Sequence, residues 1–296
     1  MNRIVAKAEF SHDPAVLMMQ VEAPQIARKA KGGQFVVLRV DEQGERIPLT
    51  IADIDVDKGL VTLVFQEVGK STAALGALGV GDEILNFIGP LGKPTHMDNY
   101  GTVLCIAGGI GIAPVHNIVR ELKNHGNKVI TIMGARTKEL LFWEDKMRAV
   151  SDEVLVTTDD GSYGRHGLVT AVEQELLEKD RDLGDINLVI GIGPPIMMKF
   201  VAKTSEPFGV KTLVSLNSIM VDATGMCGAC RVTVGGKTRF VCVDGPEFDG
   251  HQVDFDELMT RQRIYLEQEK VSMELFQQKR QNACDCSCSC DDGGVS

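Results

Sequence analysis

The chain has 296 residues, of which 44% are hydrophobic and 24% are charged, and its formal net charge is -10. This length leaves room for two or more domains, and the acidic charge argues against nucleic acid or an anionic membrane surface as a partner. The N-terminal segment MNRIVAKAEF lacks the apolar core of a signal peptide, and no run of about eighteen apolar residues could span a bilayer. We therefore expect a cytoplasmic protein with no membrane span.

The first part of the chain, residues 1–97, consists of short β-rich segments. Its apolar runs are GQFVVLRV, LVTLVFQEV and DEILNFIG, and turns rich in glycine, proline and charge separate them. Helical periodicity is weak in this part. The pattern predicts an antiparallel β-barrel or sandwich.

The next part, residues 98–212, has a different pattern. Four apolar runs, TVLCIAGG, KVITIMGA, EVLVTTDD and INLVIGIG, alternate with segments of helical character. Continuous apolar strands alternating with helices are typical of a parallel sheet that is covered on both faces. We expect Cys105, which lies inside the first run, to be a buried thiol.

The C-terminal part divides into three predicted segments. Residues 213–255 are rich in glycine and cysteine and too few to form a core of their own, so a metal would have to stabilise them. Residues 256–283 predict a helix that packs on the body or on a partner, with few breakers over 256–281. Residues 284–296 form a low-complexity tail that we expect to be disordered, with cysteines at alternate positions: Cys284, Cys286, Cys288 and Cys290.

A glycine-rich stretch, AGGIGIAP, follows the first strand of the predicted parallel sheet and precedes a helix. Such a loop lets the backbone approach a pyrophosphate at a helix N-terminus, although a tight turn in any α/β protein can look similar. The residues predicted to bind the cofactor here are Gly108, Gly109, Gly111 and Pro114.

Two further loops are predicted at the same edge of that sheet. GIGPPIMM follows the last predicted strand and supplies Gly193, Pro194 and Met197, while TTDDGSYGRHG follows an earlier strand and supplies Asp159 and Asp160. Ligands of open α/β sheets bind at the carboxyl ends of the strands. The three loops together therefore predict one dinucleotide-binding crevice.

The barrel part carries two candidate ligand stretches. GKST resembles half of a P-loop, but Val64 stands where the first glycine of that motif would be, so a nucleoside triphosphatase is not predicted. The stretch either holds a diphosphate through Gly69, Lys70, Ser71 and Thr72 or is an ordinary polar turn. RIPLTI offers Pro48, Leu49 and Thr50 to the edge of a ring.

A metal site is predicted in the stretch VDATGMCGACRVTVGGKTRFVC. Asp222, Cys227, Cys230 and Cys242 reproduce the C-x4-C-x2-C…C spacing of plant-type [2Fe–2S] sites, with an aspartate in the first position. A carboxylate is an anionic ligand for iron. Two alternatives remain from the residues alone: an iron–sulfur site that has decayed, or a tetrahedral zinc site with one aspartate and three cysteines.

These motifs occur in a recognisable order. The RIPLTI strand, the GKST turn, a GPLG stretch at residues 89–92, GGIGIAP and GIGPP together resemble the ferredoxin-reductase-like flavoproteins over residues 1 to about 212. The resemblance implies that the barrel binds FAD and that the α/β domain binds NAD(H) or NADP(H). One departure is that Ile47 stands where the wider family has an arginine, with Arg46 one residue earlier.

The cysteine-rich stretch narrows the resemblance. A reductase with a [2Fe–2S] site at its C-terminus resembles the electron-transfer subunit of dihydroorotate dehydrogenase B. It resembles more closely the small subunit of NADH-dependent reduced ferredoxin:NADP oxidoreductase, also described as sulfide dehydrogenase. In the second group an aspartate and three cysteines hold the cluster, which implies that Asp222 is a working ligand. The resemblance also implies a larger partner subunit with a second flavin and [4Fe–4S] clusters, where electron bifurcation to ferredoxin and NADP would occur. The alternate-cysteine tail is not part of this pattern.

The predicted activity is electron transfer from NAD(P)H to FAD and then singly to the [2Fe–2S] cluster, because a flavin converts two-electron into one-electron chemistry. Arg136 could pair with a 2′-phosphate, whereas Asp159 and Asp160 on the same rim would repel one, which favours NADH. One alternative is a subunit that serves dihydroorotate oxidation. The other is a zinc-bearing interaction subunit without turnover.

Overall fold

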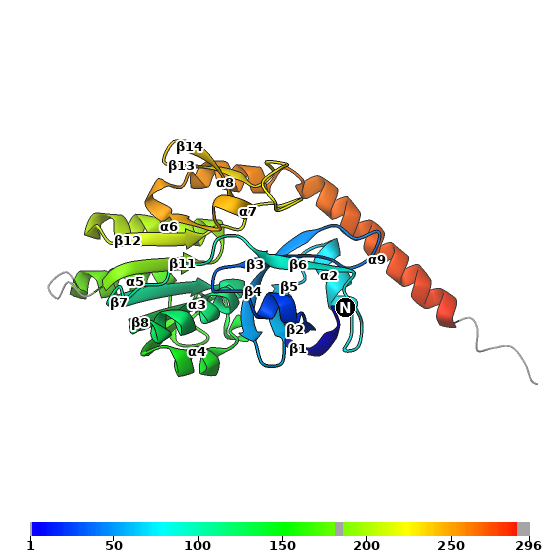
Figure 1. The fold of residues 1–296 in the computed structure, drawn as a ribbon, viewed down its shortest axis with the longest axis horizontal. Coiled ribbons are helices and arrows are strands. Elements are labelled where there is room, and N and C mark those ends of the chain that lie inside the picture. Colours follow the sequence, from blue (N-terminus) through cyan, green and yellow to red (C-terminus); the bar gives the residue numbers. More distant parts are fainter. Residues whose placement is uncertain (1, 181–185, 289–296) are drawn as a thin grey trace, which may run out of the picture.

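The computed structural model describes residues 2–180 and 186–288, with the backbone alone for Asp180 and for 282–288. Three regions pack side by side, and a long helix at the C-terminal end extends away from them (Figure 1). None of the helices in these ranges is long and apolar enough to cross a membrane.

The N-terminal region is the predicted antiparallel barrel. Its strands are β1 (Ile4–His12), β2 (Ala15–Glu22), β3 (Phe35–Arg39), β4 (Ile47–Asp55), β5 (Leu60–Gln66) and β6 (Asn86–Leu91), in the order β1-β2-β5-β4-β3-β6. Its helices are α1 (Pro24–Ala27) and α2 (Lys70–Ala77). The chain just before β6 closes the barrel onto β1, since Ile4 N donates to Asp82 O at 2.9 Å and Gly81 N donates to Ile4 O at 2.8 Å. Alternate residues such as Leu17, Met19 and Val21 fill its interior.

The second region is the predicted α/β sheet, with more strands than expected. β7 (Thr102–Gly108), β8 (Lys128–Ala135), β9 (Glu153–Thr158) and β11 (Ile186–Ile192) are the four predicted strands. The structure adds β10 (Arg165–His166), β12 (Lys211–Ser215) and β15 (Glu247–Asp249), in the order β10-β9-β8-β7-β11-β12-β15. All neighbours are parallel except β12 and β15.

Helices cover both faces of this sheet. They are α3 (Ile112–Asn124), α4 (Glu144–Val150), α5 (Val169–Asp180) and α6 (Pro195–Ser205). Val103 and Cys105 of β7 point into the core that α3 and α4 line, while Leu104 and Ile106 point into the core that α5 and α6 line. This explains why apolar residues occupy most positions of β7, on both faces of the sheet. Cys105 has no exposed surface, as predicted.

The C-terminal region is connected to this sheet through one strand and otherwise forms a small sheet of its own. β13 (Arg231–Val234) and β14 (Lys237–Phe240) make a hairpin, α7 (Val241–Asp244) follows, and β15 adds an antiparallel strand beside β12. β12 itself spans residues 211–215, so the boundary expected between residues 212 and 213 falls inside a strand.

The prediction of one continuous C-terminal helix was wrong. α8 (Phe255–Gln262) ends on the body, where Phe255 and Leu258 are buried, and α9 (Leu266–Cys288) starts after a break. Arg261 donates to Ala229 O at 3.1 Å and fixes the end of α8. Because α9 extends to Cys288, the backbone of the first part of the expected disordered tail is helical; residues 289–296, with Cys290, lie outside the described residues.

Candidate functional site

The two predicted glycine loops meet between β7 and β11. These strands are neighbours, but the chain leaves β7 into α3 on one face of the sheet and leaves β11 into α6 on the other. A side chain at Gly193 would lie 2.7 Å from Met197 Cε and 3.2 Å from Gly108 Cα. The loops therefore touch at the carboxyl ends of β7 and β11, which is where open α/β sheets bind ligands.

The glycines of the first loop have separate roles. A Cβ on Gly108 would overlap Met197 Sδ, and a Cβ on Gly111 would overlap the carbonyl oxygen of Ile192. These two glycines allow the loops to pack together. Gly109 has a φ of 55°, and among the described residues no atom lies within 4 Å of a Cβ built there. Gly109 is therefore where a ligand's phosphate has room to approach the backbone.

The third loop lies on the same rim, two strands away. Asp159 N donates to Ala135 O at 3.0 Å, and Asp160 N donates to Arg136 O at 3.2 Å, which places both aspartates beside the end of β8. Ser162 donates to the Asp160 carboxylate and lowers its pKa, so that carboxylate is charged at neutral pH. Asp159, Asp160 and Arg136 are all exposed.

A cavity beyond the ends of β8 and β9 was missed by the sequence analysis. It has a volume of about 510 Å³ and is lined by Lys138, Leu141, Phe142, Trp143, Glu144, Asp145, Lys146 and Tyr163. Trp143 takes a left-handed backbone conformation, with φ 58°, and the Lys146 ammonium lies 4.2 Å from the centre of its ring. The aromatic run Phe142-Trp143 after β8 was the signal that could have revealed this cavity.

The barrel residues predicted to contact a ring and a diphosphate lie at one end of the barrel. Ile51 of β4 pairs with Leu63 of β5, so Pro48, Leu49 and Thr50 lie near the end of β5, just before α2. The first N–H groups of α2, from Lys70 onward, have no partner within the helix and favour an anion.

The hydroxyl of Thr72 is not free, contrary to the expectation that it would face a diphosphate. It accepts hydrogen bonds from Val68 N and Gly69 N, both at 3.1 Å, and it donates to Gly69 O at 3.0 Å. It therefore caps α2. Of the predicted diphosphate group, the side chains of Lys70 and Ser71 remain, because the N–H and the carbonyl of Gly69 are also bonded within this turn.

The barrel end and the glycine loops share one interface. Ala52 and Val64 of the barrel pack in the same core as Ile112 and Ala113, which start α3. Arg120 of α3 forms an ion pair with Asp53 of β4. A flavin on β4 and α2 and a nucleotide on the glycine loops would therefore face the same junction.

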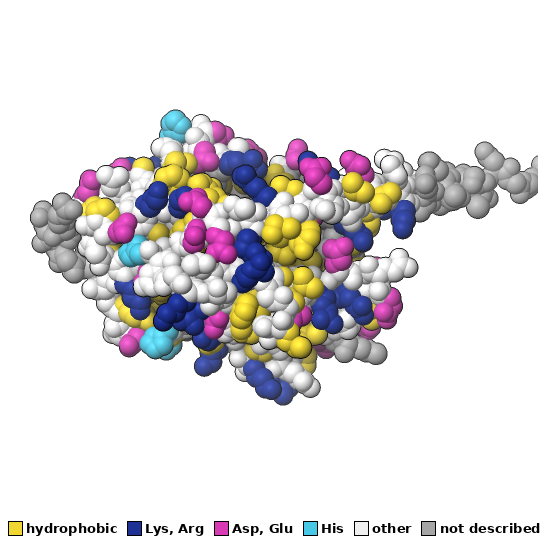
Figure 2. Space-filling view, turned by 90° about the horizontal axis from the view of Figure 1, so that it is seen from above, with side chains coloured by type: hydrophobic (Ala, Val, Ile, Leu, Met, Phe, Trp, Pro, Cys, Tyr) yellow, Lys and Arg dark blue, Asp and Glu magenta, His cyan; other side chains and the backbone are white. Residues whose placement is uncertain are grey.

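The four predicted metal ligands form two pairs. The Cys227 thiol donates to Asp222 Oδ1 at 3.0 Å, and the Cys230 thiol donates to Cys242 Sγ at 3.2 Å. The first pair lies on an exposed loop, whereas Cys230 and Cys242 are each only 2% exposed. Figure 2 looks down on the face that includes this region, where acidic, basic and apolar side chains are interspersed.

Hydrogen bonds and burial determine whether the predicted metal ligands are ionised. The Cys227 thiol, followed by Thr224, lowers the pKa of the Asp222 carboxyl to about 2. Burial and the adjacent Cys230 thiol raise the pKa of the Cys242 thiol to about 12. Metal ligation requires thiolates, so assembly of a centre here releases protons.

The paired arrangement fits a two-iron centre. A single tetrahedral ion needs four donors around one point, whereas these four residues are arranged as two close pairs. In a [2Fe–2S] cluster each iron takes two protein ligands, which matches two donor pairs. Two donors bound to one ion at about 2.0–2.3 Å lie roughly 3.5 Å apart, so each pair needs to open by only a few tenths of an ångström.

One hydrophobic core connects the three sites. Cys230 and Cys242 are buried together with Phe35 and Val37 of the barrel and Met198 of α6, and Met197 packs against the same core. Phe35 pairs with Thr50, while Met197 touches both glycine loops. The predicted flavin strand β4 and the two glycine loops are thus one or two side chains from this core, and Cys230 and Cys242 lie within it.

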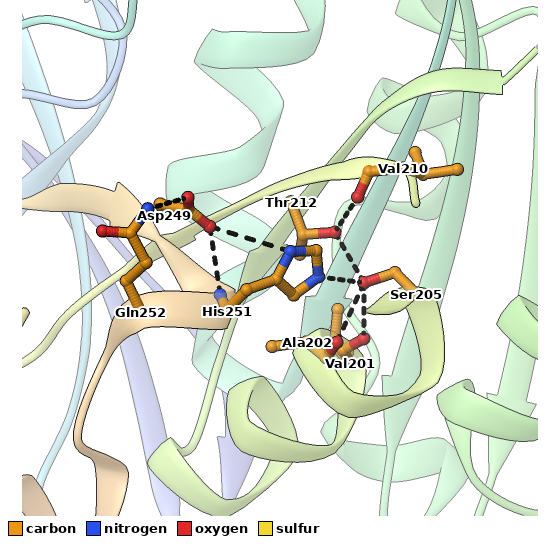
Figure 3. Close-up of polar contacts among 8 residues, drawn as sticks. All are labelled: Val201, Ala202, Ser205, Val210, Thr212, Asp249, His251 and Gln252. Atoms are coloured by element: carbon orange, nitrogen blue, oxygen red, sulfur yellow. Dashed lines mark hydrogen bonds and ion pairs between the residues drawn. The ribbon is translucent and has the colours of Figure 1, made fainter. Parts of the chain in front are cut away.

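A serine, a histidine and an aspartate also lie side by side in the α/β region (Figure 3). Ser205 Oγ is 3.1 Å from His251 Nε2, but His251 Nδ1 is 3.8 Å from Asp249 Oδ1, too far for a hydrogen bond. Ser205 has no exposed surface, and its hydroxyl donates to the carbonyl groups of Val201 and Ala202. This group joins α6 to the C-terminal region and cannot attack a substrate.

Comparisons with known proteins agree with this geometry. Residues 105–203 match the oxidoreductase NAD-binding domain, and residues 217–254 match the iron–sulfur cluster binding domain of dihydroorotate dehydrogenase B. The "dihydroorotate dehydrogenase B (NAD(+)), electron transfer subunit homolog" of Thermotoga maritima is 48% identical over 93% of this chain and 95% of its own.

Two solved structures are also similar. A chain from the structure of NADH-dependent reduced ferredoxin-NADP oxidoreductase aligns with a TM-score of 0.86 and 47% identity, over 93% of this chain and 98% of that one. A ferredoxin NADP+ reductase from Neisseria gonorrhoeae, solved with FAD and NADP, has a TM-score of 0.55 and 18% identity over 70% of this chain and 90% of that one, and shows the shared fold.

The fold and the matched domains define an oxidoreductase subunit with a ferredoxin-reductase-like body and an iron–sulfur region. The chain belongs to the family of dihydroorotate dehydrogenase B electron transfer subunits and their homologues. It is therefore an electron-transfer subunit that acts with a partner subunit. The iron–sulfur match decides against the zinc alternative and against an interaction subunit without redox chemistry.

Proposed function

We propose that this chain is the NADH-oxidising subunit of an enzyme related to NADH-dependent reduced ferredoxin-NADP oxidoreductase. In this proposal the barrel holds FAD, the glycine loops hold NADH, and Asp222, Cys227, Cys230 and Cys242 hold the [2Fe–2S] cluster. The flavin supplies the exchange between hydride and single-electron chemistry, and the cluster supplies a one-electron acceptor. Cysteines stay reduced and free to bind metal in the cytoplasm, which supports a cytoplasmic location.

The observation that carries the proposal is the shared core. Phe35 links it to the strand with Pro48, Leu49 and Thr50, Met197 links it to Gly108 and Gly193, and Cys230 and Cys242 lie within it. A hydride donor, a flavin and a cluster held by these groups would be neighbours. The 47% identity to a chain of the bifurcating oxidoreductase supports the same arrangement.

The residues of this chain have defined tasks in the proposal. Gly109 leaves room for the nucleotide phosphates, and the N-terminal turns of α3 and α6 stabilise their charge. Lys70, Ser71 and the first N–H groups of α2 hold the flavin diphosphate. The tight contact of Met197 with both glycine loops excludes water from the floor of the crevice.

The charges on the rim favour NADH over NADPH. Asp160 is ionised at neutral pH, and Asp159 lies next to it, so a 2′-phosphate placed on this rim would meet two carboxylates. The adenosine half of the nucleotide has room in the cavity lined by Trp143 and Tyr163. The competing positive charges are Arg136 on this rim and Lys138 and Lys146 in the lining of the cavity.

We assign the larger partner subunit a second flavin and [4Fe–4S] clusters, through which electrons are exchanged with ferredoxin. The match to the bifurcating oxidoreductase supports this partner. The alternative partner is a dihydroorotate dehydrogenase, which the matched iron–sulfur domain and the Thermotoga maritima relative favour. Tagging the chain in its own cells and identifying the subunit that co-purifies under anaerobic conditions distinguishes the two.

The experiment that tests the redox function uses the chain purified anaerobically. We expect about one FAD, two iron and two inorganic sulfide per chain, and we expect NADH to bleach the flavin absorption within the mixing time. NADPH at the same concentration should act more slowly. A colourless preparation that takes up no flavin on incubation with FAD would refute the proposal, and faster bleaching by NADPH would refute the nucleotide assignment alone.

A further inference from the structure

The two oxygens of Asp222 have different surroundings. Oδ2 accepts hydrogen bonds from Thr224 Oγ1 at 3.0 Å and from the backbone N–H groups of Met226 and Cys227, both at 3.2 Å. Oδ1 accepts from the Cys227 thiol at 3.0 Å and, more weakly, from Thr224 N at 3.3 Å. One oxygen therefore has three donors from its own loop, and the other faces a prospective iron ligand.

This asymmetry predicts how the carboxylate would bind iron. When the Cys227 thiol loses its proton to become a ligand, the contact from Sγ to Oδ1 loses its hydrogen. Asp222 Oδ1 and Cys227 Sγ are then two anionic ligand atoms that face the same iron position, while Oδ2 keeps its three hydrogen bonds. The geometry favours ligation through Oδ1 alone.

We propose that Thr224 is a positioning residue for the cluster: its hydroxyl holds Oδ2 of Asp222, directs Oδ1 to iron and raises the reduction potential. The inference rests on the proposed role of Asp222 as a ligand. Thr224 provides the side-chain donor to Oδ2, whereas the other two donors are backbone groups that no substitution removes. Thr224 itself is exposed, so changing its side chain leaves the packed core untouched.

The local backbone supports this role. Ala223, between the two residues, has a φ of 59° and is only 2% exposed, because its side chain packs in the core that contains Cys230 and Cys242. A non-glycine residue holds a left-handed conformation only where its surroundings enforce it. The buried Ala223 therefore fixes the turn that brings the Thr224 hydroxyl back to Asp222.

The sign of the effect on the potential follows from charge. The reduced cluster carries one more negative charge than the oxidised cluster, so a hydrogen bond to a ligand oxygen stabilises the reduced state more. Thr224→Val removes the donor and keeps the shape, and it should lower the reduction potential. We expect a change of up to about tenfold in the one-electron equilibrium, which corresponds to 59 mV. Thr224→Ser keeps the hydroxyl and should retain the wild-type potential.

The test is a redox titration of the purified full chain, followed by the electron paramagnetic resonance signal of the reduced cluster. Thr238→Val is the matched control, because Thr238 is an exposed threonine on the neighbouring hairpin. A lowered potential in Thr224→Val, with wild-type values in Thr224→Ser and Thr238→Val, supports the inference. Loss of iron in Thr224→Val but not in Thr224→Ser supports it as well.

Three results would overturn it: an unchanged potential in Thr224→Val, a raised potential, or the same change in Thr224→Ser. Asp222→Ala separates this inference from the function on which it rests. If Asp222→Ala keeps its iron and its spectrum, the proposed ligand is wrong. If Asp222→Ala loses the cluster while Thr224→Val matches the wild type, only the role of Thr224 is refuted.

Discussion

Glu173 is a carboxylic acid in an apolar core, and it makes the stability of the chain depend on pH. It lies in α5 with no exposed surface, and among the residues that the structure describes neither of its carboxyl oxygens has a hydrogen-bond partner. Its burial raises its pKa from 4.5 to about 9. At neutral pH the folded chain therefore holds this group protonated, whereas the unfolded chain releases the proton.

The sign and size follow from proton linkage. The folded state binds more protons than the unfolded state between pH 4.5 and about 9, so the free energy of unfolding falls as the pH rises through that window. The slope is about 1.4 kcal/mol per pH unit, which gives a penalty of about 3 kcal/mol at pH 7. Between pH 6 and pH 8 the loss is about 2.7 kcal/mol, or about 4 °C in Tm for a chain of this length.

The assay is thermal unfolding of wild type and Glu173→Met at several values of pH between 6 and 8. We expect the variant to be more stable than the wild type and the difference to grow with pH, because methionine fills the site without a proton to lose. Glu178→Met is the control, since Glu178 is an exposed carboxyl on the same helix, and its curve should stay parallel to that of the wild type. Parallel curves for Glu173→Met and wild type would refute the reasoning.

Two further predictions concern the cofactor sites. Asp222→Ala should lose or destabilise the cluster, whereas Asp222→Cys restores the plant-type thiolate set and should retain a [2Fe–2S] centre with a shifted reduction potential. Iron content and electron paramagnetic resonance measure both results. Full iron and an unchanged potential in Asp222→Ala would show that another group completes the site. Gly111→Ala places a Cβ on the carbonyl of Ile192 and should push the glycine loops apart. We expect this change to raise the KM for NADH by about tenfold or more and to lower the free energy of unfolding by about 1–3 kcal/mol. A KM equal to that of the wild type would contradict the packing role of Gly111.

Local sequence patterns were enough to predict the main elements of the fold. β7, β8, β9 and β11 are largely buried on both faces, so each appears as a run that is mostly apolar and does not alternate strictly between apolar and polar residues. The spacing of Asp222, Cys227, Cys230 and Cys242 was visible because ligands of a small centre lie close together along the chain. The structure brings these four residues together in two pairs.

Features that depend on contacts between distant segments could not be predicted. β15 is three residues long and is a strand only because β12 lies beside it. The packing of Gly108 against Met197 joins loops almost ninety residues apart, and no local pattern shows which glycine faces a ligand and which faces another loop. The break between α8 and α9 depends on contacts such as Arg261 with Ala229, because the sequence there contains no glycine or proline.

The position of the aspartate in the proposed ligand set has a physical reason. Cys230 and Cys242 are buried in a core of apolar side chains, where a carboxylate would lose its hydration without compensating donors. Asp222 lies at the exposed end of the set, where Thr224 and two backbone N–H groups donate to it. A thiolate at this position would use these donors less well, because sulfur is a weaker acceptor than a carboxylate oxygen. These hydrogen bonds therefore support our proposal that Asp222 is an oxygen ligand, and they argue against a cysteine site that has merely decayed.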